Sequence, residues 1–435
     1  MGVSDGAHLG VLLAILAPLA GALLVGLVAV LGDGDPREET ASRAVGAGLV
    51  ASIVGSVLAL LSFWGVWAPA RGDLELGDWL RLGDYVIPLT LVLDGLSVTI
   101  SLFAAVLTAL VARFSRTYLH KEMGFVRFFG LLGFFATGTQ LIAFSGALEL
   151  FFAGWEIVGI TSALFIGYFH ERDEPQRSSI RAFSTYRLAD AGLLIATVTT
   201  FELLGSARFS DLAGAVNLPS IDATAIALLF LISAMGKSAQ LPFSSWLPRA
   251  MEGPTPSSAL FYGAVSIHAG LFLLLRVWPV FEASPMARTA GVVVGLATAV
   301  YAASVARVHT DAKGALSHAT LAQVGLILAE ICLGWTRLAL THLVCHALLR
   351  LGQYLKAPNT IHDTHRRGHH HPTPNWIERL APALASRVYA ASLHRLRLDD
   401  RIDAAFSPVL ALARWLDDVD RRLRERSSLD KVVGS

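Results

Sequence analysis

Runs of about 20 apolar residues recur along this chain of 435 residues. A helix of that length crosses the hydrocarbon core of a bilayer while pairing all its own backbone polar groups. Apolar residues make up 54% of the sequence and charged residues only 16%. The pattern therefore predicts an all-α, polytopic membrane protein with about eleven transmembrane helices. The predicted spans are residues 9–31, 45–67, 88–112, 128–145, 147–169, 185–204, 223–247, 257–277, 289–306, 317–334 and 338–356.

The orientation of these spans is predicted from the basic loops. The first apolar run resembles a cleaved secretory signal in position, but it lacks a positively charged start and is long enough to span. Arginine and lysine gather in alternate loops, and such loops stay in the cytoplasm. The basic loops contain Arg113, Arg116 and Lys121, then Arg172, Arg177 and Arg181, then Arg307 and Lys313. Counting spans from these loops predicts an N-terminus outside and a cytoplasmic tail from about Lys356.

The sequence of the tail after Lys356 predicts two amphipathic helices, near 375–395 and 400–426. In the second helix, apolar residues repeat at helical spacing opposite Asp and Arg side chains. These apolar residues are Ile402, Ala405, Phe406, Val409, Leu412, Ala413 and Leu416. We expect this face to lie on the membrane surface, with docking onto a partner subunit as the alternative.

The same tail opens with a histidine-rich stretch, IHDTHRRGHHH. Its histidines are His362, His365 and His369 to His371. They are of a residue type that binds metals, but they lack a fixed ligand spacing. A solvated, basic loop that faces a partner is therefore favoured over a metal site.

Lys237 lies within an apolar run, LFLISAMGKSAQLPFSSWL, just ahead of Pro242 and Pro248. An ammonium at membrane depth costs a few kcal/mol, so a chain rarely keeps one without a pathway or a partner. Proline after the lysine breaks the helix and frees backbone carbonyls, which are tolerated only beside water or protein. We therefore expect a discontinuous seventh helix beside a hydrated cavity at mid-membrane.

Further ionisable residues form a series through the predicted spans. The series is Glu149, Glu156, Asp190, Lys237, His268, Glu330, His342, His346 and Arg350. Glu156 is the expected counter-charge for Lys237, since moving a carboxylate toward or away from an amine switches its protonation state. His342, His346 and Arg350 have i, i+4, i+8 spacing, so they lie along one helical face and can relay a proton. A proton path is favoured over ion pairs that merely hold helices together.

Several stretches carry a family resemblance. They are GWEIVGITSALFIGYF from Gly154, YRLADAGLL from Tyr186, GKSAQLPFSSWLPRAMEGPTPSSAL from Gly236, DAKGALSHATLAQVGLI from Asp311 and THLVCHALLR from Thr341. Together they resemble the antiporter-like proton-pumping subunits of respiratory complex I. The resemblance implies an antiporter-like fold in which Glu156 and Lys237 match the key glutamate and the broken-helix lysine. His342 and His346 match its central pair of histidines. Arg350 replaces the lysine that follows, and because arginine keeps its proton at accessible pH it should act as a fixed charge.

Two departures from the family pattern indicate one branch of it. Tyr262, in FYGAVSIHAG, replaces the histidine that follows GPTPSSAL, and His268 comes after it. This sequence stretch resembles the membrane subunit of Dab-type inorganic-carbon accumulation complexes. The predicted spans also stop after the eleventh, whereas the complex I and Mrp antiporter subunits that the chain resembles continue with more helices, so the second of the family's inverted repeats is expected to be truncated. The expected parts are N-terminal helices in 1–87, a first repeat in 88–280, a partial second repeat in 281–357 and a tail in 358–435.

The Dab-type resemblance implies a proton-conducting subunit of a bacterial inner membrane. Its implied partner is a large soluble zinc-binding, carbonic-anhydrase-like subunit (DabA-like), in which proton flow would drive hydration of carbon dioxide to bicarbonate. Zinc is expected in that partner and no cofactor in this chain. The sequence has neither a CxxC cluster nor a GxGxxG after a strand, so the energy for transport should come from an existing gradient.

The net charge of +1 gives no reason to expect a nucleic-acid partner. The alternatives are a cation/proton antiporter or complex I-type pump, and a structural membrane anchor for a soluble enzyme.

Overall fold

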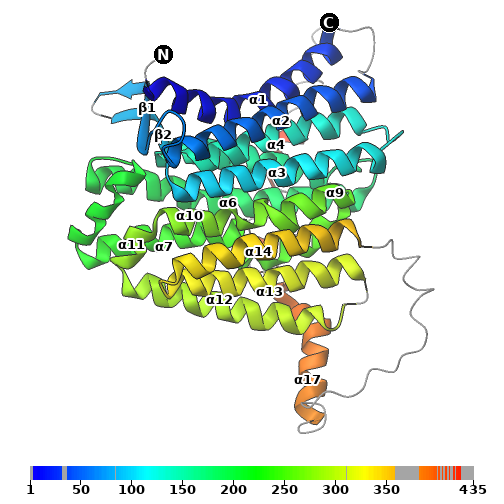
Figure 1. The fold of residues 1–435 in the computed structure, drawn as a ribbon. Coiled ribbons are helices and arrows are strands. Elements are labelled where there is room, and N and C mark those ends of the chain that lie inside the picture. The colour runs from blue at the N-terminus through cyan, green and yellow to red at the C-terminus, as the bar shows by residue number, and fades with distance from the viewer. Residues whose placement is uncertain are drawn as a thin grey trace, which may run out of the picture. The chain divides into compact units, whose positions relative to one another are not determined.

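The computed structural model describes residues 3–31, 37–83, 85–309, 311–357 and 382–398, with isolated positions between 400 and 422. The chain forms two compact units, Met1–His370 and His371–Ser435. In the first unit, long helices lie side by side (Figure 1). They are α1 (Val3–Leu31), α2 (Glu38–Phe63), α3 (Gly95–Tyr118), α4 (Phe125–Phe144), α5 (Leu148–Ile166), α6 (Asp173–Leu204), α7 (Ser220–Lys237), α12 (Pro285–Ala306), α13 (Ala312–Cys332) and α14 (Thr336–Leu355).

Nine helices in the described part of the chain are long and apolar enough to cross a membrane. They match nine of the eleven predicted spans. The other two predicted spans, 185–204 and 338–356, are also helical, as α6 and α14, but they are not among those nine. Helix α6 begins at Asp173, well before the predicted start. The mostly helical, polytopic fold is thus confirmed, and the number of crossings stays a prediction.

Helix α1 packs closely against α2. A Cβ on Gly48 would lie 2.5 Å from the carbonyl oxygen of Ala17, and a Cβ on Gly55 would lie 2.5 Å from the backbone nitrogen of Ala14. The two backbones can approach this far only because each glycine side chain is a hydrogen. Lipid tails are as apolar as leucine, so such close van der Waals contact is what holds two helices together in a bilayer.

A β-hairpin, which was not predicted from the sequence, separates α2 from α3. Strand β1 (Gly72–Leu82) pairs antiparallel with β2 (Tyr85–Leu93). Hydropathy places the start of the third span at residue 88, because the run YVIPLTLVL of β2 is as apolar as a membrane helix. The prediction of that boundary was wrong, since α3 begins only at Gly95.

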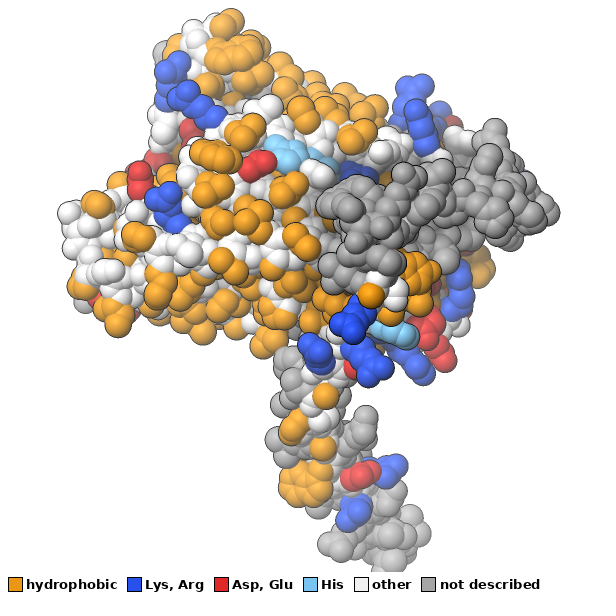
Figure 2. All heavy atoms as spheres, turned by 90° about the horizontal axis from the view of Figure 1, so that it is seen from below, with side chains coloured by type: hydrophobic (Ala, Val, Ile, Leu, Met, Phe, Trp, Pro, Cys, Tyr) orange, Lys and Arg blue, Asp and Glu red, His pale blue; other side chains and the backbone are white. Residues whose placement is uncertain are grey.

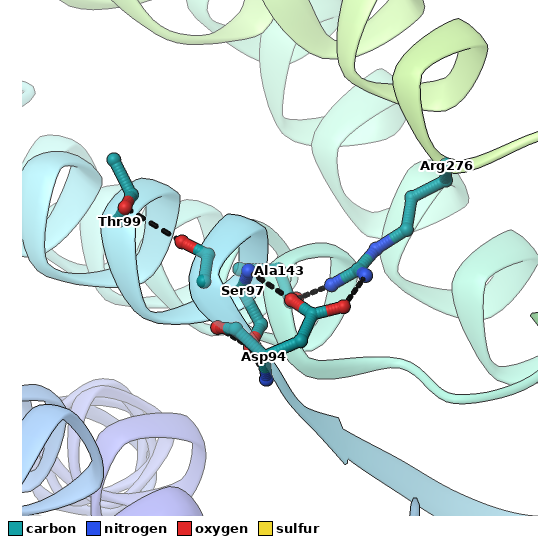
Figure 3. A network of polar contacts seen from close by, with 6 residues as sticks. Asp94, Ser97, Thr99, Ala143 and Arg276 are labelled. Carbon is teal, nitrogen blue, oxygen red and sulfur yellow. Dashed lines mark hydrogen bonds and ion pairs between the residues drawn. The ribbon is translucent and has the colours of Figure 1, made fainter. Parts of the chain in front are cut away.

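Asp94 fixes the start of α3. Its carboxylate accepts the backbone N–H of Ser97 at 2.7 Å, and the Ser97 hydroxyl accepts the backbone N–H of Asp94 at 2.9 Å, which forms a capping box. Arg276 pairs with the same carboxylate and donates to the Ala143 carbonyl (Figure 3). Burial raises the pKa of Asp94, but the Arg276 guanidinium and the hydrogen bonds from Ser97 together outweigh burial and leave the pKa below its ordinary value. The network joins the start of α3, the end of α4 and the end of α10 (Ala269–Arg276).

The seventh predicted span is discontinuous, as expected. Helix α7 ends at Lys237, and a turn leads to the 3₁₀ segment η2 (Phe243–Ser245) and the short helix α8 (Trp246–Arg249). Pro242 lies at this break. Pro248 was wrongly predicted to mark it, since this residue lies inside α8. Proline is tolerated in the first turn of a helix because the N–H that it lacks would have no intrahelical partner there.

The eighth predicted span is irregular, which the sequence did not indicate. Its segments are α9 (Thr255–Ser257), the π-helical η4 (Ser258–Ala264), the 3₁₀ segment η5 (Ser266–His268) and α10. The N–H of Val265 donates to the carbonyl of Leu260 at 2.7 Å, five residues back. A π-helical turn is rare in proteins, and where one occurs it is often at a functional site; this one comes just before His268.

Two further short helices of the first unit are η1 (Phe209–Asn217) and α11 (Trp278–Glu282), and η3 (Ala250–Glu252) follows α8.

The outer face that carries α12 and α13 is apolar. Figure 2 shows hydrophobic side chains over much of the face seen from below the view of Figure 1. Exposed residues of α12 include Val293 and Val300, and those of α14 include Leu348 and Leu349. A surface of this kind suits contact with lipid tails or with an apolar partner.

The second unit contains helix α17 (Pro382–Leu393) and the 3₁₀ segment η6 (Arg395–Arg397). Helix α17 falls within the first predicted amphipathic helix, 375–395. Most of the second predicted helix, 400–426, lies outside the described residues, and so does the histidine-rich stretch 361–371.

Candidate functional site

Lys237 is buried at the end of α7, with 1% of its surface exposed. Its Nζ donates to the backbone carbonyl of Trp155 at 3.0 Å. The same nitrogen lies 4.7 Å from the centre of the Trp155 ring and 5.0 Å from that of Tyr186, both within cation–π range. A Cβ on Gly159 would lie 2.9 Å from Nζ, so this glycine of α5 leaves the space that the ammonium fills. The amine is therefore held by neutral groups.

The carboxylates beside this amine are bound to another cation. Arg187 forms ion pairs with both Glu156 and Asp190, the second at 2.8 Å. The Trp155 indole N–H also donates to Asp190. Glu156 lies in the same group as Lys237, for which it was the predicted counter-charge, but among the described residues its ion pair is with Arg187 and not with the amine. The guanidinium projects from the middle of α6 toward α5 and presents a planar fork that suits two carboxylates.

We call Trp155, Glu156, Tyr186, Arg187, Asp190 and Lys237 the lysine cluster. It holds two acids and two bases, so its formal charge sums to zero when all four are ionised. Arg187 is 37% exposed, whereas Asp190 is 3% exposed. The fixed charge of the cluster is thus the group with the most access to the surroundings, and the amine is the most enclosed. Loss of one proton from Lys237 would leave the cluster with a net negative charge.

Hydroxyl groups extend from the lysine cluster toward the eighth span. The Ser162 hydroxyl of α5 lies 3.2 Å from the Tyr186 hydroxyl and 3.4 Å from that of Tyr262. The Tyr262 hydroxyl also donates to the Ser162 carbonyl at 3.2 Å. Tyr262 belongs to the π-helical segment η4. Three buried hydroxyls therefore lie between Lys237 and the element that ends near His268.

A second polar group centres on His268 and His346. The Nδ1 of His268 lies 2.9 Å from the Ala264 carbonyl, so this nitrogen must carry the proton. Its Nε2 can then accept from His346 Nδ1, which lies 3.1 Å away. The remaining Nε2 of His346 accepts from Arg350 Nε at 3.2 Å. All these contacts are satisfied by two neutral imidazoles of one tautomer, hydrogen-bonded in one direction.

His342 extends this row along α14. Its Nδ1 lies 2.9 Å from a Glu330 carboxylate oxygen and its Nε2 lies 3.1 Å from the amide oxygen of Gln323. The His342 and His346 ring centres are 6.3 Å apart. The prediction that His342, His346 and Arg350 share one face of α14 is thus confirmed. We call His268, Gln323, Glu330, His342, His346, Arg350 and Gln353 the histidine cluster, because Gln353 accepts from Arg350 at 2.7 Å.

A small cavity of about 40 Å³ lies beside His268. Its wall includes Val158 of α5, Thr139 of α4 and Ser266 next to His268. The volume is that of about one water molecule, but most of the wall is apolar and both ring nitrogens of His268 are already hydrogen-bonded, so the hydroxyls of Thr139 and Ser266 are the polar side-chain groups left in the lining. The cavity therefore lies between α5, which carries part of the lysine cluster, and His268, which opens the histidine cluster.

Glu149 is the one predicted ionisable residue that belongs to neither cluster. It is half-buried in the first turn of α5, two turns before Glu156. Conversely, the parts that Trp155, Tyr186, Arg187, Gln323 and Gln353 play in the two clusters were not predicted from the sequence. Only Arg187 had a usable signal, since its i, i+3 spacing to Asp190 is that of a helical ion pair.

Two known protein families match parts of this chain. The family described as "NADH:quinone oxidoreductase/Mrp antiporter, TM" matches residues 145–384, more than half of the chain. The family "NADH-Ubiquinone oxidoreductase (complex I), chain 5 N-terminus" matches residues 79–129. The first match contains both clusters in full.

Individual relatives agree with this placement. NADH-quinone oxidoreductase subunit L of Rhodobacter capsulatus is 33% identical over 369 residues, which are 81% of this chain and 51% of that protein. NAD(P)H-quinone oxidoreductase chain 5 of Picosynechococcus sp. is 31% identical over 355 residues, covering 79% of this chain and 53% of that protein. The chain thus spans about half the length of these curated relatives.

Solved structures share the fold. A chain of the Mrp complex from Dietzia sp. DQ12-45-1b has a TM-score of 0.67 at 25% identity, covering 89% of this chain and 41% of that one. A chain of the membrane-bound sulfane sulfur reductase, an archaeal respiratory membrane complex, has a TM-score of 0.66 at 17% identity, covering 79% of this chain and 70% of that one. The second likeness is one of fold alone. The chain is therefore a multi-pass membrane protein of the NADH:quinone oxidoreductase/Mrp antiporter transmembrane family.

Proposed function

We propose that this chain moves protons through a membrane by way of the lysine and histidine clusters. The observation that carries the proposal is the setting of Lys237, whose Nζ is bound by a carbonyl and two rings while the nearby carboxylates are bound by Arg187. An ammonium in a direct carboxylate pair is locked in its charged form. One held by neutral groups can give up its proton when the charges around it move.

Arg187 supplies the moving charge in this scheme. While its guanidinium lies against Glu156 and Asp190, it neutralises both acids and leaves Lys237 without their full attraction. A guanidinium that turns toward solvent would expose both carboxylates to Lys237 and favour proton uptake there. Its return would favour release. Arg187 keeps its own proton throughout, so the only group that changes protonation in this step is the amine.

The histidine cluster supplies the route beyond the amine. A proton that reaches His268 Nε2 displaces the hydrogen bond from His346, and His268 must lose the proton on Nδ1 or return the new one. Arg350 is a fixed positive charge at the far end of the two imidazoles, so an added proton is repelled and does not rest there. The Ser162 and Tyr262 hydroxyls offer places for the intervening transfer.

The proposal is tested by proton uptake in sealed vesicles that contain the chain within its native complex, under an imposed gradient. Lys237→Ala should abolish uptake while the complex assembles normally. Lys121→Ala, which removes an exposed lysine, is the matched control and should leave uptake unchanged. Normal uptake by the Lys237→Ala vesicles would contradict the proposal and favour the structural anchor.

We further propose that the chain works as one subunit of a multi-subunit membrane complex. Its relatives are named as subunits of quinone oxidoreductases, and a similar fold occurs in an Mrp complex. These names support complex I-type proton translocation or cation/proton antiport as the wider activity. Adding Na⁺ or K⁺ to the vesicles separates the two, because only an antiporter should show cation-dependent proton release without any electron donor.

A second candidate is coupling of the proton flow to inorganic-carbon uptake. This candidate is supported by Tyr262, which stands where the family has a histidine, in a stretch that resembles Dab-type membrane subunits. The Tyr262 hydroxyl donates to the Ser162 carbonyl beside the lysine cluster. The partner would be a large soluble zinc protein similar to carbonic anhydrase, on the cytoplasmic side of a bacterial plasma membrane, with the N-terminus of this chain outside. Affinity purification of the full chain tests this coupling. A co-purifying zinc protein, with growth at air levels of carbon dioxide that depends on Lys237, would support it, whereas recovery of redox subunits alone would oppose it.

A further inference from the structure

A groove runs along the outer side of α2 and α3, over α4, with a volume of about 490 Å³. Helices α2, α3 and α4 pack against one another at this place (Figure 1). Most of its wall is apolar, and Phe129 of α4 lines it as well. The lining residues that matter here are Arg43, Gly46, Val50, Ile53, Val106, Leu110, Arg113 and Arg116.

The charge of the groove is confined to one end. Arg43 lies near the start of α2, and Arg113 and Arg116 lie near the end of α3. Arg43 is paired with Glu39 at 2.6 Å. Among the described residues, Arg113 and Arg116 have no ion-pair partner, and both are exposed. This end therefore carries three guanidinium groups, of which Glu39 neutralises one.

The second acid near this end is already engaged elsewhere. Glu38 binds His120 Nδ1 at 2.8 Å and the backbone N–H of Lys121 at 2.8 Å. Those two bonds hold the turn after α3 against the start of α2. They also fix the mouth of the groove, since the two helix ends that carry the arginines are tied together.

The length of the groove matches one leaflet of a bilayer. From Arg43 to Ile53 on α2, and from Arg116 back to Val106 on α3, the groove runs about 15 Å at the helical rise. The hydrocarbon core is about 30 Å thick, so this is the depth of one layer of acyl chains. Val50 and Leu110 are 60% and 51% exposed, and a Cβ on Gly46 would meet nothing within 4 Å. The wall is thus open along the whole depth.

We propose that this groove binds an anionic phospholipid, with one acyl chain along α2 and α3 and the phosphate against Arg113 and Arg116. Charge complementarity selects this occupant, because basic pockets beside transmembrane helices bind anionic head groups. A transmembrane helix of a partner subunit would need an acid placed at the same depth, whereas such a lipid brings its phosphate to the level of the arginines. The inference does not rest on proton transport.

Native mass spectrometry of the purified full chain in mild detergent tests it. The probes are phosphatidylglycerol and phosphatidylcholine with identical acyl chains, added in competition. Arg113→Ala with Arg116→Ala should weaken phosphatidylglycerol binding about 25-fold, near fivefold for each arginine, and remove the preference over phosphatidylcholine. Gly46→Phe should fill the groove and reduce retention of both lipids. Its new side chain enters open space, so the fold is preserved.

The control is Arg172→Ala with Arg177→Ala, which removes two exposed arginines near the start of α6. It should bind phosphatidylglycerol as the wild type does. Unchanged phosphatidylglycerol binding in the Arg113/Arg116 variant, or an equal loss in the control, would overturn the site. So would full competition by glycerol phosphate, which has no acyl chain, or cross-linking of a probe at position 46 to a partner protein in native membranes.

Discussion

The lysine cluster and the histidine cluster both bury titratable groups, but they neutralise charge in different ways. In the lysine cluster, two acids and two bases balance one another, and one arginine is shared between the acids. In the histidine cluster, Glu330 binds His342, while His268 and His346 form a directed row of neutral imidazoles that ends at the charge of Arg350. A balanced cluster can store a proton when its charges shift. A neutral row ending in a fixed charge can pass a proton on but cannot hold one.

The difference also separates the parts that Lys237 and Arg350 play. Lys237 is enclosed by Trp155, Tyr186 and the space left by Gly159. Arg350 instead donates to His346 and Gln353, both of which accept without a charge. A lysine in the first setting can exist as a neutral amine, whereas an arginine in the second cannot. The following changes exploit this contrast.

The largest effect is expected from Lys237→Arg. Arginine keeps the positive charge and the balance of the lysine cluster, but it does not release its proton. If Lys237 acts only as a structural charge, proton uptake should survive. We expect a fall of about 100-fold in the uptake rate, as for loss of a general acid–base group, with normal assembly. Vesicle uptake assays measure the rate, and a Lys237→Arg variant with wild-type uptake would show that the charge alone suffices.

Arg187→Gln should come next. It leaves Glu156 and Asp190 facing Lys237 without a competing cation, so the ammonium should be held in its charged form and uptake should slow strongly. Breaking a fully buried pair costs about 3–5 kcal/mol, and the partial exposure of Arg187 should reduce that cost. The rate and the thermal unfolding midpoint should both be measured. Arg187→Lys is the control, because it restores the charge with a poorer fork and should recover part of the rate.

A smaller effect is expected from His346→Gln, which interrupts the imidazole row. Glutamine can hydrogen-bond to His268 and Arg350 but cannot take up and release a proton. His342→Gln is the matched change on the same face of α14, at a residue bound to Glu330 and Gln323. Uptake should therefore fall further in His346→Gln than in His342→Gln. Equal rates in the two variants would argue that the row through His268 is not the route.

Gly159→Ala should act more mildly on the lysine cluster. The added Cβ would lie 2.9 Å from Lys237 Nζ, so the amine or α5 must shift by a few tenths of an ångström. We expect uptake to be reduced severalfold while the histidine cluster is unaffected. Gly167→Ala, near the end of the same helix, is the control. A Gly159→Ala rate equal to that of the wild type would show that the amine has free space around it.

The smallest effect is a local one outside both clusters, at the start of α13. Asp311 accepts from the Gly314 N–H at 2.6 Å, and hydrogen bonding to His309 lowers its pKa to about 2. Because the folded pKa lies below the ordinary value of 3.8, the carboxylate contributes stability above that value and loses it as the pH falls through about 2. Asp311→Ala should cost about 1 kcal/mol near neutral pH. The difference from wild type in thermal unfolding should shrink at acid pH; a difference that grows there would contradict the assignment.

Much of the architecture could be predicted because helix length and hydropathy determine where a chain can cross a bilayer. The break after Lys237 and the shared face of His342, His346 and Arg350 were predictable from local spacing. The binding partners of Lys237 were not. Its acceptor is the Trp155 carbonyl, and a backbone atom has no sequence signature. The pairing of Glu156 with Arg187 depends on how α6 is rotated against α5, which only packing decides.

Two elements of the fold escaped prediction for related reasons. The strand β2 is apolar enough to be taken for part of a span, and only the capping box of Asp94 with Ser97 ends the hairpin and starts α3. The π-helical segment before His268 depends on backbone hydrogen bonds rather than on residue type. Hydropathy predicts which segments of the chain lie in the membrane, but it does not predict whether a segment there forms a regular α-helix.

The most direct test is to observe the nitrogen of Lys237 itself. The chain has only five lysines, Lys121, Lys237, Lys313, Lys356 and Lys431, so ¹⁵N-labelled lysine gives few side-chain signals, and Lys237→Arg assigns the one of interest. In lipid bilayers, the wild type should show both ammonium and neutral amine at position 237, in a ratio that changes with pH. The Arg187→Gln variant should show ammonium only. A Lys237 signal that remains ammonium in the wild type at every pH at which the protein stays folded would contradict the account.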